Sequence, residues 1–189
     1  MPQITVVGLG ICQPPLLSPQ ALNALSICDC VMGSPRQLES LADVQTCVSA
    51  THLHLPKLKQ ITNDIKGFER VVILASGDPL LFGIGKYLQG QFTGHTVTCI
   101  SGVSSVQGAC ELTGLSLQDA QLISLHGRPL SNLNRYLQPN RNLLILTDQN
   151  SNPQAIAQAL VAANLGQSNL HVCERLGYDD QNHRQFKAS

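Results

Sequence analysis

The sequence lacks an excess of charge of either sign. Its 189 residues include 12 Lys and Arg and 12 Asp and Glu, so the formal net charge is zero. Proteins that bind nucleic acid or an anionic membrane surface usually concentrate positive charge in one region. The balanced composition therefore argues against the binding of a polyanion as the main activity.

Long apolar runs are absent too. No uncharged apolar stretch reaches the roughly 18 residues that a membrane-spanning helix needs. Met1 opens directly onto a strand-like segment instead of a signal peptide. We therefore expect a soluble, cytoplasmic protein, and a chain of this length can bury a large core in one domain or in two small ones.

The C-x-x-C spacing of many metal and redox sites is also missing from the seven cysteines. Their number is odd and their positions are scattered, so we expect most of these thiols to be reduced and buried. The tightest spacings of soft metal ligands are Cys28 with Cys30 and His52 with His54. Neither pair has a second pair at the spacing of a metal site, and we expect no bound metal.

The stretch Val71–Gly85 joins an apolar run to a turn that carries a carboxylate. Its first five residues predict a strand that is buried on both faces of a parallel sheet. The turn that follows, S-G-D-P from Ser76, predicts a helix over Leu80–Leu88. Asp78 then either lies on the rim of a ligand cleft at the carboxyl end of the strand or merely caps that helix.

Two more segments repeat this order of buried strand, small-residue turn and helix. Ile4–Val7 precedes the turn Gly8–Cys12, and Thr96–Ile100 precedes the turn Ser101–Ser105. The repetition predicts an α/β fold with a parallel sheet whose turns line one edge. Serine–proline pairs mark further helix starts at Ser18 and Ser34, because a serine can cap a helix that a proline begins.

The three turns would converge if their strands are neighbours. They would then offer backbone groups, hydroxyls and one carboxylate to a polar small molecule. The sequence has no G-x-S-x-G, no P-loop lysine and no H-E-x-x-H. A site rich in backbone groups and poor in acid–base residues suits a reaction whose reactive group arrives on a cofactor.

The second half of the chain differs in pattern. Gln121–Leu125, Asn142–Thr147 and Leu170–Glu174 are predicted strands, and Asn152–Asn164 is a predicted helix that begins at a proline. The candidate junction between the halves lies near Leu115. We therefore predict an N-terminal α/β domain over residues 1–115 and a C-terminal α/β domain over residues 116–189.

Four motifs follow one another in an informative order: V-G-L-G from Val7, A-S-G-D-P-L-L-F-G from Ala75, G-V-S-S from Gly102 and L-H-G-R-P from Leu125. In order and spacing they resemble the motifs of the tetrapyrrole methylases, over nearly the whole chain. Within that family, S-L-H-G-R-P, L-T-D from Leu146 and C-E-R-L-G-Y from Cys173 look most like the methylases of cobalamin synthesis that act on ring carbon 5 of precorrin-7 or cobalt-precorrin-7.

The resemblance implies the two-domain α/β fold of the class III S-adenosylmethionine-dependent methyltransferases. It implies a largely parallel sheet in the N-terminal domain, a mixed sheet in the C-terminal domain and a homodimer. It also implies that S-adenosylmethionine binds in a cleft between the domains and that a corrin precursor is the substrate. Carried over residue by residue, the cofactor contacts are Leu9, Ser76, Gly77, Asp78, Leu81, Ser104, Ser105 and Thr147.

Two side chains of the predicted loop after Leu125 suit the substrate that the resemblance implies. His126 could accept a proton from the ring, because histidine changes charge near neutral pH. It could instead bind a substrate carboxylate or hydrogen-bond the loop backbone. Arg128 could hold an acetate or propionate group of the substrate through a bidentate pair, or form an ordinary surface ion pair.

The first glycine loop departs from the family pattern, since G-I-C-Q-P-P follows Leu9. The altered loop leaves one rival to methylation at carbon 5, a non-catalytic module that binds S-adenosylmethionine. A second rival is methylation of another ring carbon or of a different substrate, because the fold and the cofactor site do not determine the acceptor. A chelatase built on His52, His54 and His126 is a more distant alternative. The chain is also shorter than its relatives at the C-terminus, and we expect a separate partner enzyme to act on carbon 15.

Overall fold

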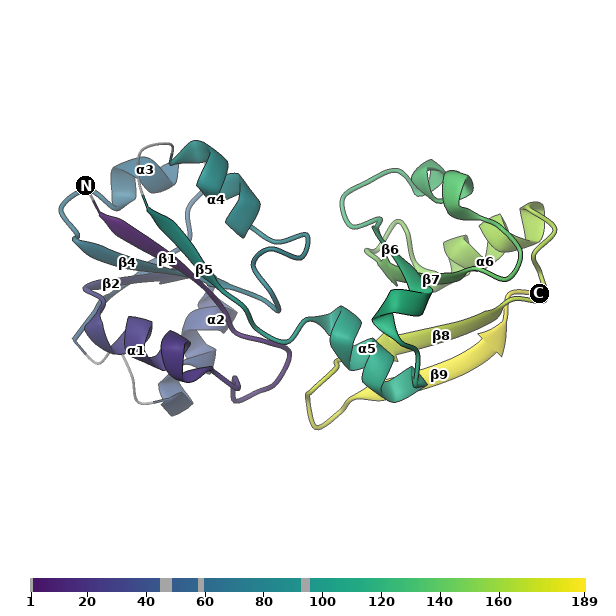
Figure 1. Ribbon diagram of the computed structural model, residues 1–189, viewed down its shortest axis with the longest axis horizontal. Helices are drawn as coiled ribbons and strands as arrows, with labels where there is room; N and C mark the ends of the chain where they lie inside the picture. Colours follow the sequence, from purple (N-terminus) through teal and green to yellow (C-terminus); the bar gives the residue numbers. More distant parts are fainter. Residues whose placement is uncertain (1, 45–48, 58–59, 93–95) are drawn as a thin grey trace. The chain divides into compact units, whose positions relative to one another are not determined.

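The structure, a computed structural model, describes residues 2–44, 49–57, 60–92 and 96–189 (Figure 1). The chain divides into two compact units, Met1–Ser105 and Val106–Ser189. This division falls at the start of helix α5 (Ser105–Thr113), whereas the boundary predicted from the sequence follows that helix. The predicted domain boundary stays a prediction, and each unit is described by itself.

A five-stranded sheet forms the centre of the N-terminal unit, with strands in the order β3-β2-β4-β1-β5 (Figure 1). The strands are β1 (Gln3–Gly8), β2 (Cys30–Gly33), β3 (Thr51–His54), β4 (Arg70–Ala75) and β5 (Val97–Ile100). Every pair of neighbouring strands in this sheet is parallel. The parallel sheet predicted from the repeated order of strand, turn and helix is therefore confirmed.

Helices cover both faces of this sheet (Figure 1). They are α1 (Pro19–Ile27), α2 (Pro35–Ser40), α3 (Ile61–Asp64) and α4 (Gly85–Gln91), and a single 3₁₀ turn, η1 (Ala42–Val44), follows α2. On one face Ile73 of β4 belongs to the same buried cluster as Ile61 and Leu88. On the other face Leu74 shares a cluster with Leu25. The run Val71–Ala75 of β4 is thus buried on both faces, as its uncharged sequence predicts.

Three helices begin where the sequence places a capping residue before a proline. Ser18 accepts the N–H of Ala21 at 3.2 Å at the start of α1. Ser34 caps α2, and Asn152 accepts the N–H of Ala155 at 2.9 Å at the start of α6 (Pro153–Ala162). Each side-chain oxygen satisfies a backbone donor that the first turn of a helix leaves without a partner.

The helix predicted over Leu80–Leu88 begins later, at Gly85. The side chain of Asp78 accepts the N–H of Leu80 at 2.7 Å, which closes a local turn instead of a helical one. Phe82 adopts a φ of 55°, outside the right-handed helical region. The prediction of the helix start was therefore wrong by five residues, because the aspartate and Phe82 extend the turn.

The C-terminal unit contains two small sheets. Strands β6 (Ala120–Ser124) and β7 (Asn142–Leu146) are parallel, whereas β8 (Asn169–Glu174) and β9 (Asn182–Lys187) are antiparallel. Two 3₁₀ segments, η3 (Leu117–Asp119) and η4 (Leu130–Tyr136), precede β6 and β7. The core of this unit comprises Ile123, Leu125, Leu133 and Ile156. The resemblance implied a single mixed sheet for this half, but the structure has a parallel pair and an antiparallel pair in separate sheets.

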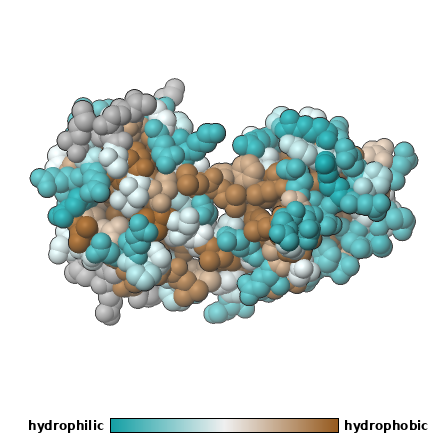
Figure 2. All heavy atoms as spheres, viewed as in Figure 1, coloured by the Kyte–Doolittle hydropathy of each residue, from teal (hydrophilic) through white to brown (hydrophobic). Residues whose placement is uncertain are grey.

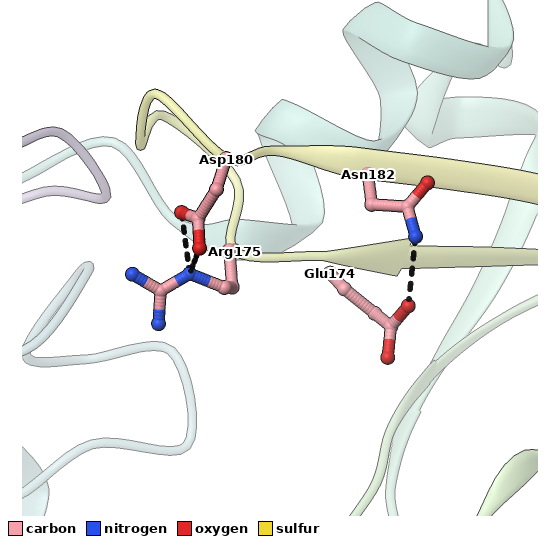
Figure 3. Close-up of polar contacts among 4 residues, drawn as sticks. All are labelled: Glu174, Arg175, Asp180 and Asn182. Atoms are coloured by element: carbon pink, nitrogen blue, oxygen red, sulfur yellow. Dashed lines mark hydrogen bonds and ion pairs between the residues drawn. The ribbon is translucent and has the colours of Figure 1, made fainter.

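Strand β9 has no counterpart among the predicted elements. All six of its residues are exposed, and only Phe186 is strongly apolar. Polar pairs align it with β8, since Glu174 accepts hydrogen bonds from Arg184 and Asn182. Figure 3 shows the contact of Glu174 with Asn182 and the ion pair of Arg175 with Asp180 in the turn between the strands.

The surface is mixed in character. Hydrophilic side chains cover much of the C-terminal unit on the face that Figure 2 shows. No helix in the described part of the chain is both long and apolar enough to cross a membrane. Exposed apolar side chains of the N-terminal unit include Leu80, Phe82 and Val103, which belong to the turns that follow β4 and β5.

Candidate functional site

Three glycine-containing turns meet at the carboxyl edge of the parallel sheet. Strand β1 lies between β4 and β5, so the turns that leave these strands are neighbours. Gly10 and Gly77 form an isolated antiparallel bridge, in which each backbone N–H donates to the other's carbonyl at 3.3 and 3.1 Å. The convergence predicted from the sequence is therefore present within the N-terminal unit.

The turns approach one another more closely than side chains would allow. A Cβ atom on Gly8 would lie 2.4 Å from the carbonyl oxygen of Gly77 and 2.6 Å from the amide nitrogen of Gly102. A Cβ atom on Gly102 would lie 2.5 Å from the carbonyl oxygen of Gly77. Gly77 itself adopts a φ of 61°, which favours glycine. These three residues, which we call the glycine cluster, allow the backbones of the three turns to pack directly against one another.

The polar side chains of the second turn lie beside the glycine cluster. Ser76 accepts a hydrogen bond from Nε2 of Gln37 at 3.1 Å. Asp78 uses Oδ1 for the N–H of Leu80. Burial raises the pKa of the Cys99 thiol on β5, and the nearby negative charge of Asp78 adds to that rise. Asp78 therefore serves the local turn and also places a carboxylate near the end of β5.

The other predicted cofactor contacts of the N-terminal unit surround the same point. Leu9 is buried, and its N–H donates to the carbonyl of Ala75 at 2.9 Å. Ser104 is buried at the turn after β5, and a Cβ atom on Gly77 would lie 3.5 Å from its Cα. The N–H of Leu81 donates to the carbonyl of Asp78 at 3.3 Å. Ser105 is the first residue of α5.

The predicted residues of the C-terminal unit gather around the ends of β6 and β7. Nδ1 of His126 lies 3.2 Å from the carbonyl oxygen of Thr147. A carbonyl oxygen only accepts, so Nδ1 carries the proton and Nε2 of the neutral ring keeps its lone pair. A terminal nitrogen of Arg128 donates to the carbonyl of Ser124 at 3.3 Å. The sequence left three roles open for His126, and a hydrogen bond to backbone was one of them.

Asp148 holds this loop together, although its sequence context predicted no role for it. Its Oδ2 accepts the N–H of Gly127 at 2.7 Å, and its Oδ1 accepts those of Asn150 at 2.9 Å and Ser151 at 2.8 Å. The hydrogen bonds from Ser151 and Gly127 are the main reasons that the pKa of this carboxyl lies below its usual value. An aspartate directly after a predicted strand is the signal that could have identified it.

Metal binding finds no support in the side-chain arrangement of the described ranges. His, Cys, Asp and Glu side chains do not gather there in any group of three that could hold a metal ion. His52 and His54 lie on β3 of the N-terminal unit, whereas His126 belongs to the C-terminal unit. Cys47 lies outside the described residues.

A parallel sheet with glycine turns crowded at its carboxyl edge is the arrangement in which open α/β proteins place their ligand sites. The sequence profile of the tetrapyrrole (corrin/porphyrin) methylases matches residues 3–189. The chain therefore belongs to the tetrapyrrole methylase family, as its four ordered motifs indicate.

Two relatives illustrate the similarity in sequence. The chain is 35% identical over 178 residues to a decarboxylating precorrin-6Y C(5,15)-methyltransferase from a Sinorhizobium species. This alignment covers 93% of this chain and 43% of that protein. It is 31% identical over 189 residues to the cobalt-precorrin-7 C(5)-methyltransferase of Salmonella typhimurium. This alignment covers 94% of this chain and 87% of that protein. The chain thus spans less than half of the first relative and most of the second.

Solved structures share the fold. A precorrin-6Y methylase from Archaeoglobus fulgidus aligns with a TM-score of 0.72 at 23% identity, over 98% of this chain and 90% of that one. The uroporphyrin-III C-methyltransferase of Thermus thermophilus, in complex with S-adenosylhomocysteine, aligns with a TM-score of 0.76 at 20% identity, over 98% and 83% of the two chains. These likenesses confirm the predicted fold class.

Proposed function

We propose that the protein is an S-adenosylmethionine-dependent methyltransferase that methylates ring carbon 5 of precorrin-7 or cobalt-precorrin-7 in cobalamin biosynthesis. The observation that carries the proposal is the glycine cluster, packed beside Ser76 and Asp78 in a chain of the tetrapyrrole methylase family. Relatives at 35% and 31% identity are named for methylation at carbon 5, which supports the choice of substrate.

The glycine cluster fits a cofactor with many hydrogen-bonding groups. Ser76 and Asp78 lie in its second turn, and within the described residues no hydrogen bond occupies Oδ2 of Asp78. That oxygen can accept from a hydroxyl or an ammonium group of the cofactor. In this proposal the contacts to S-adenosylmethionine are made by Leu9, Ser76, Gly77, Asp78, Leu81, Ser104, Ser105 and, in the C-terminal unit, Thr147.

Positioning supplies most of the catalysis in this proposal. When bound, S-adenosylmethionine would supply an activated methyl group. The nucleophilic ring carbon would form the new carbon–carbon bond in line with the sulfur–methyl bond that breaks, and S-adenosylhomocysteine would leave. The protein then needs to align the two partners and exclude water. The apolar side chains of Leu80, Phe82 and Val103, exposed at the turns, suit the flat apolar part of a macrocycle.

Two residues of the C-terminal unit are proposed to act on the substrate. With its proton on Nδ1, His126 has Nε2 available to accept the proton that leaves the ring carbon after methylation. Arg128 is proposed to pair with a carboxylate of the substrate, because a guanidinium binds such groups through two parallel hydrogen bonds. Asp148 supports both residues through the backbone of their loop.

We also propose that the protein works as a cytoplasmic homodimer, with a separate enzyme that acts on carbon 15. The balanced charge is compatible with a soluble protein. The Salmonella relative, which the chain covers over 87% of its length, is named for carbon 5 alone. That name supports the assignment of the second methylation to another protein.

Calorimetric titration of S-adenosylhomocysteine tests the cofactor site. We expect binding by the wild type and a loss of at least about tenfold in affinity in Asp78→Ala, because a hydrogen bond to a charged group contributes about 1.5 to 3 kcal/mol. Asp64→Ala, which removes an exposed carboxylate of α3, is the control and should bind as the wild type does. A wild type that fails to bind would contradict the proposed function.

Turnover then identifies the acceptor. Precorrin-7 and cobalt-precorrin-7 should each be offered with S-adenosylmethionine, and the position of the new methyl group should be read by NMR. Methylation at carbon 5 supports the proposal, and methylation at another carbon supports a different member of the family. Binding of S-adenosylhomocysteine without any turnover would instead support a non-catalytic module.

A further inference from the structure

Gln37 links helix α2 to the turn that follows β4. Strands β2 and β4 are hydrogen-bonded neighbours, with Met32 opposite Ile73, so their carboxyl ends lie side by side. Gln37 lies in the first turn of α2, directly after β2. A Cβ atom on Gly33 would lie only 3.3 Å from Cβ of Gln37, which shows how closely this side chain covers the end of β2.

The orientation of the Gln37 amide is determined by the helix cap. Its Oε1 accepts the N–H of Ser34 at 2.8 Å, and the N–H of Gln37 donates to the hydroxyl of Ser34 at 3.3 Å. This reciprocal pair is a capping box. A backbone N–H can only donate, so the carbonyl oxygen of the amide faces Ser34 and the NH2 group faces the other way.

The same amide determines which way the hydroxyl of Ser76 points. Nε2 of Gln37 lies 3.1 Å from Oγ of Ser76. An amide nitrogen can only donate, so Oγ accepts this bond and keeps its own proton for another partner. Ser76 is exposed beside the glycine cluster, and within the described residues no acceptor takes that proton.

We infer that Gln37 is a positioning residue that makes Ser76 a hydrogen-bond donor to the bound ligand. The inference rests on the proposed function, because it takes Ser76 as a contact of S-adenosylmethionine. The ligand atom that faces Ser76 is then an acceptor, a carboxylate or hydroxyl oxygen, and not the ammonium group. Each group in this chain of hydrogen bonds donates to the next: the N–H of Ser34 to Gln37, the NH2 group of Gln37 to Ser76, and the hydroxyl of Ser76 to the ligand.

The substitution Gln37→Glu reverses the hydrogen bond between Gln37 and Ser76 with little change in shape. Glutamate keeps an oxygen for the N–H of Ser34, so the capping box and the thermal stability should be retained. Its second oxygen replaces the NH2 group and attracts the proton of Ser76, which withdraws the donor from the ligand. The affinity for S-adenosylhomocysteine should fall about tenfold, a usual cost for a lost hydrogen bond to a charged group.

A matched control separates the effect of the reversed hydrogen bond to Ser76 from the effect of the added negative charge. Gln20→Glu introduces the same charge in the first turn of α1, another proline-initiated helix of the same unit, at an exposed position. Its affinity for S-adenosylhomocysteine should equal that of the wild type. In turnover, Gln37→Glu should raise KM for S-adenosylmethionine about tenfold and leave kcat nearly unchanged, because the lost bond serves cofactor binding and not the chemistry.

A double-mutant cycle decides the inference. Ser76→Ala removes the hydroxyl through which Gln37 is proposed to act, so Gln37→Glu should have almost no further effect on affinity in that background. An equal loss with and without the hydroxyl, or no loss in the wild-type background, would overturn the role of Gln37 while the proposed function stands. A wild type that binds no S-adenosylhomocysteine would overturn the proposed function, and this role with it.

Discussion

The candidate site of the N-terminal unit is formed largely by backbone, whereas the loop of the C-terminal unit is held by one side chain. In the first, Gly8, Gly77 and Gly102 approach so closely that a Cβ atom on Gly8 or Gly102 would overlap a neighbouring backbone. In the second, the carboxylate of Asp148 accepts three backbone N–H groups around the predicted substrate residues. Each region holds loops in place at the ends of parallel strands, the first by close backbone packing and the second by hydrogen bonds to a carboxylate.

This difference determines which substitutions and which pH changes should disrupt each region. Close packing of backbone is insensitive to pH but tolerates no added atom, because neighbouring backbone cannot move aside as a flexible side chain can. A carboxylate that accepts several N–H groups tolerates changes of neighbouring side chains but depends on its own ionisation. Substitutions and pH can therefore distinguish the two regions.

The largest effect is expected for Gly102→Ala in the glycine cluster. The added Cβ would lie 2.5 Å from the carbonyl oxygen of Gly77 and 2.6 Å from the amide nitrogen of Gly10. Both contacts are to backbone, so the turns must separate, at a cost of about 3 kcal/mol in the free energy of unfolding. Denaturant unfolding should show this loss, and titration should show that binding of S-adenosylhomocysteine is abolished.

Gly90→Ala provides the matched control for that prediction. Gly90 lies within helix α4, and a Cβ atom there would meet no atom within 4 Å. Alanine is favoured over glycine in a helix by roughly 0.5 to 1 kcal/mol, so this variant should be slightly more stable than the wild type. If Gly102→Ala were as stable as Gly90→Ala, the backbone crowding would not be a requirement of the site.

An intermediate effect is expected for Asp148→Asn in the C-terminal unit. An asparagine has one acceptor oxygen, so it cannot serve Gly127 and also the two N–H groups after it. The loop that carries His126 should loosen, and turnover should fall while binding of S-adenosylhomocysteine persists. Amide exchange at Gly127 should become faster, whereas Asp119→Asn, at an exposed position of the same unit, should leave it unchanged.

The pH dependence of stability offers a second view of Asp148. Its pKa is lower in the folded state than the ordinary value of 3.8, so its contribution favours folding above that pH and is lost as the pH falls through the folded pKa. Thermal unfolding between pH 6 and about pH 3 should therefore decline more steeply in the wild type than in Asp148→Asn. Parallel curves for the two proteins would show that this carboxylate contributes nothing to the acid sensitivity.

Much of the fold could be predicted because local signals and burial agree. The run Val71–Ala75 of strand β4 is uncharged and is buried on both faces, and Ser18 and Ser34 begin helices as their positions before proline predict. Strand β9 could not be predicted, because its residues are polar and exposed and only pairing with β8 makes them a strand. The late start of α4 was missed because the turn depends on the positive φ of Phe82.

The candidate site was predictable where glycine and small polar residues follow apolar strands. That pattern identified the turns at Gly8, Ser76 and Ser101, and the structure brings them together. The supporting residues Gln37 and Asp148 were missed, because each acts on a segment that is distant in the sequence or on backbone groups. Such contacts depend on the register between neighbouring strands, which the sequence of a single strand does not contain.

The smallest effect is expected for Ser151→Ala, and it should be stabilising. Ser151 is 1% exposed, and its hydroxyl has no hydrogen-bond partner within the described residues, although its N–H donates to Asp148. Removal of an unpaired buried hydroxyl should raise the free energy of unfolding by about 1 kcal/mol and leave the carboxylate's backbone contacts in place. The same substitution at Ser18 of the N-terminal unit should have the opposite sign, because that hydroxyl caps α1 and its loss costs about 1 kcal/mol. Denaturant unfolding of the two variants measures both changes, and a Ser151→Ala protein less stable than the wild type would mean that this hydroxyl has a partner which stabilises the Asp148 loop.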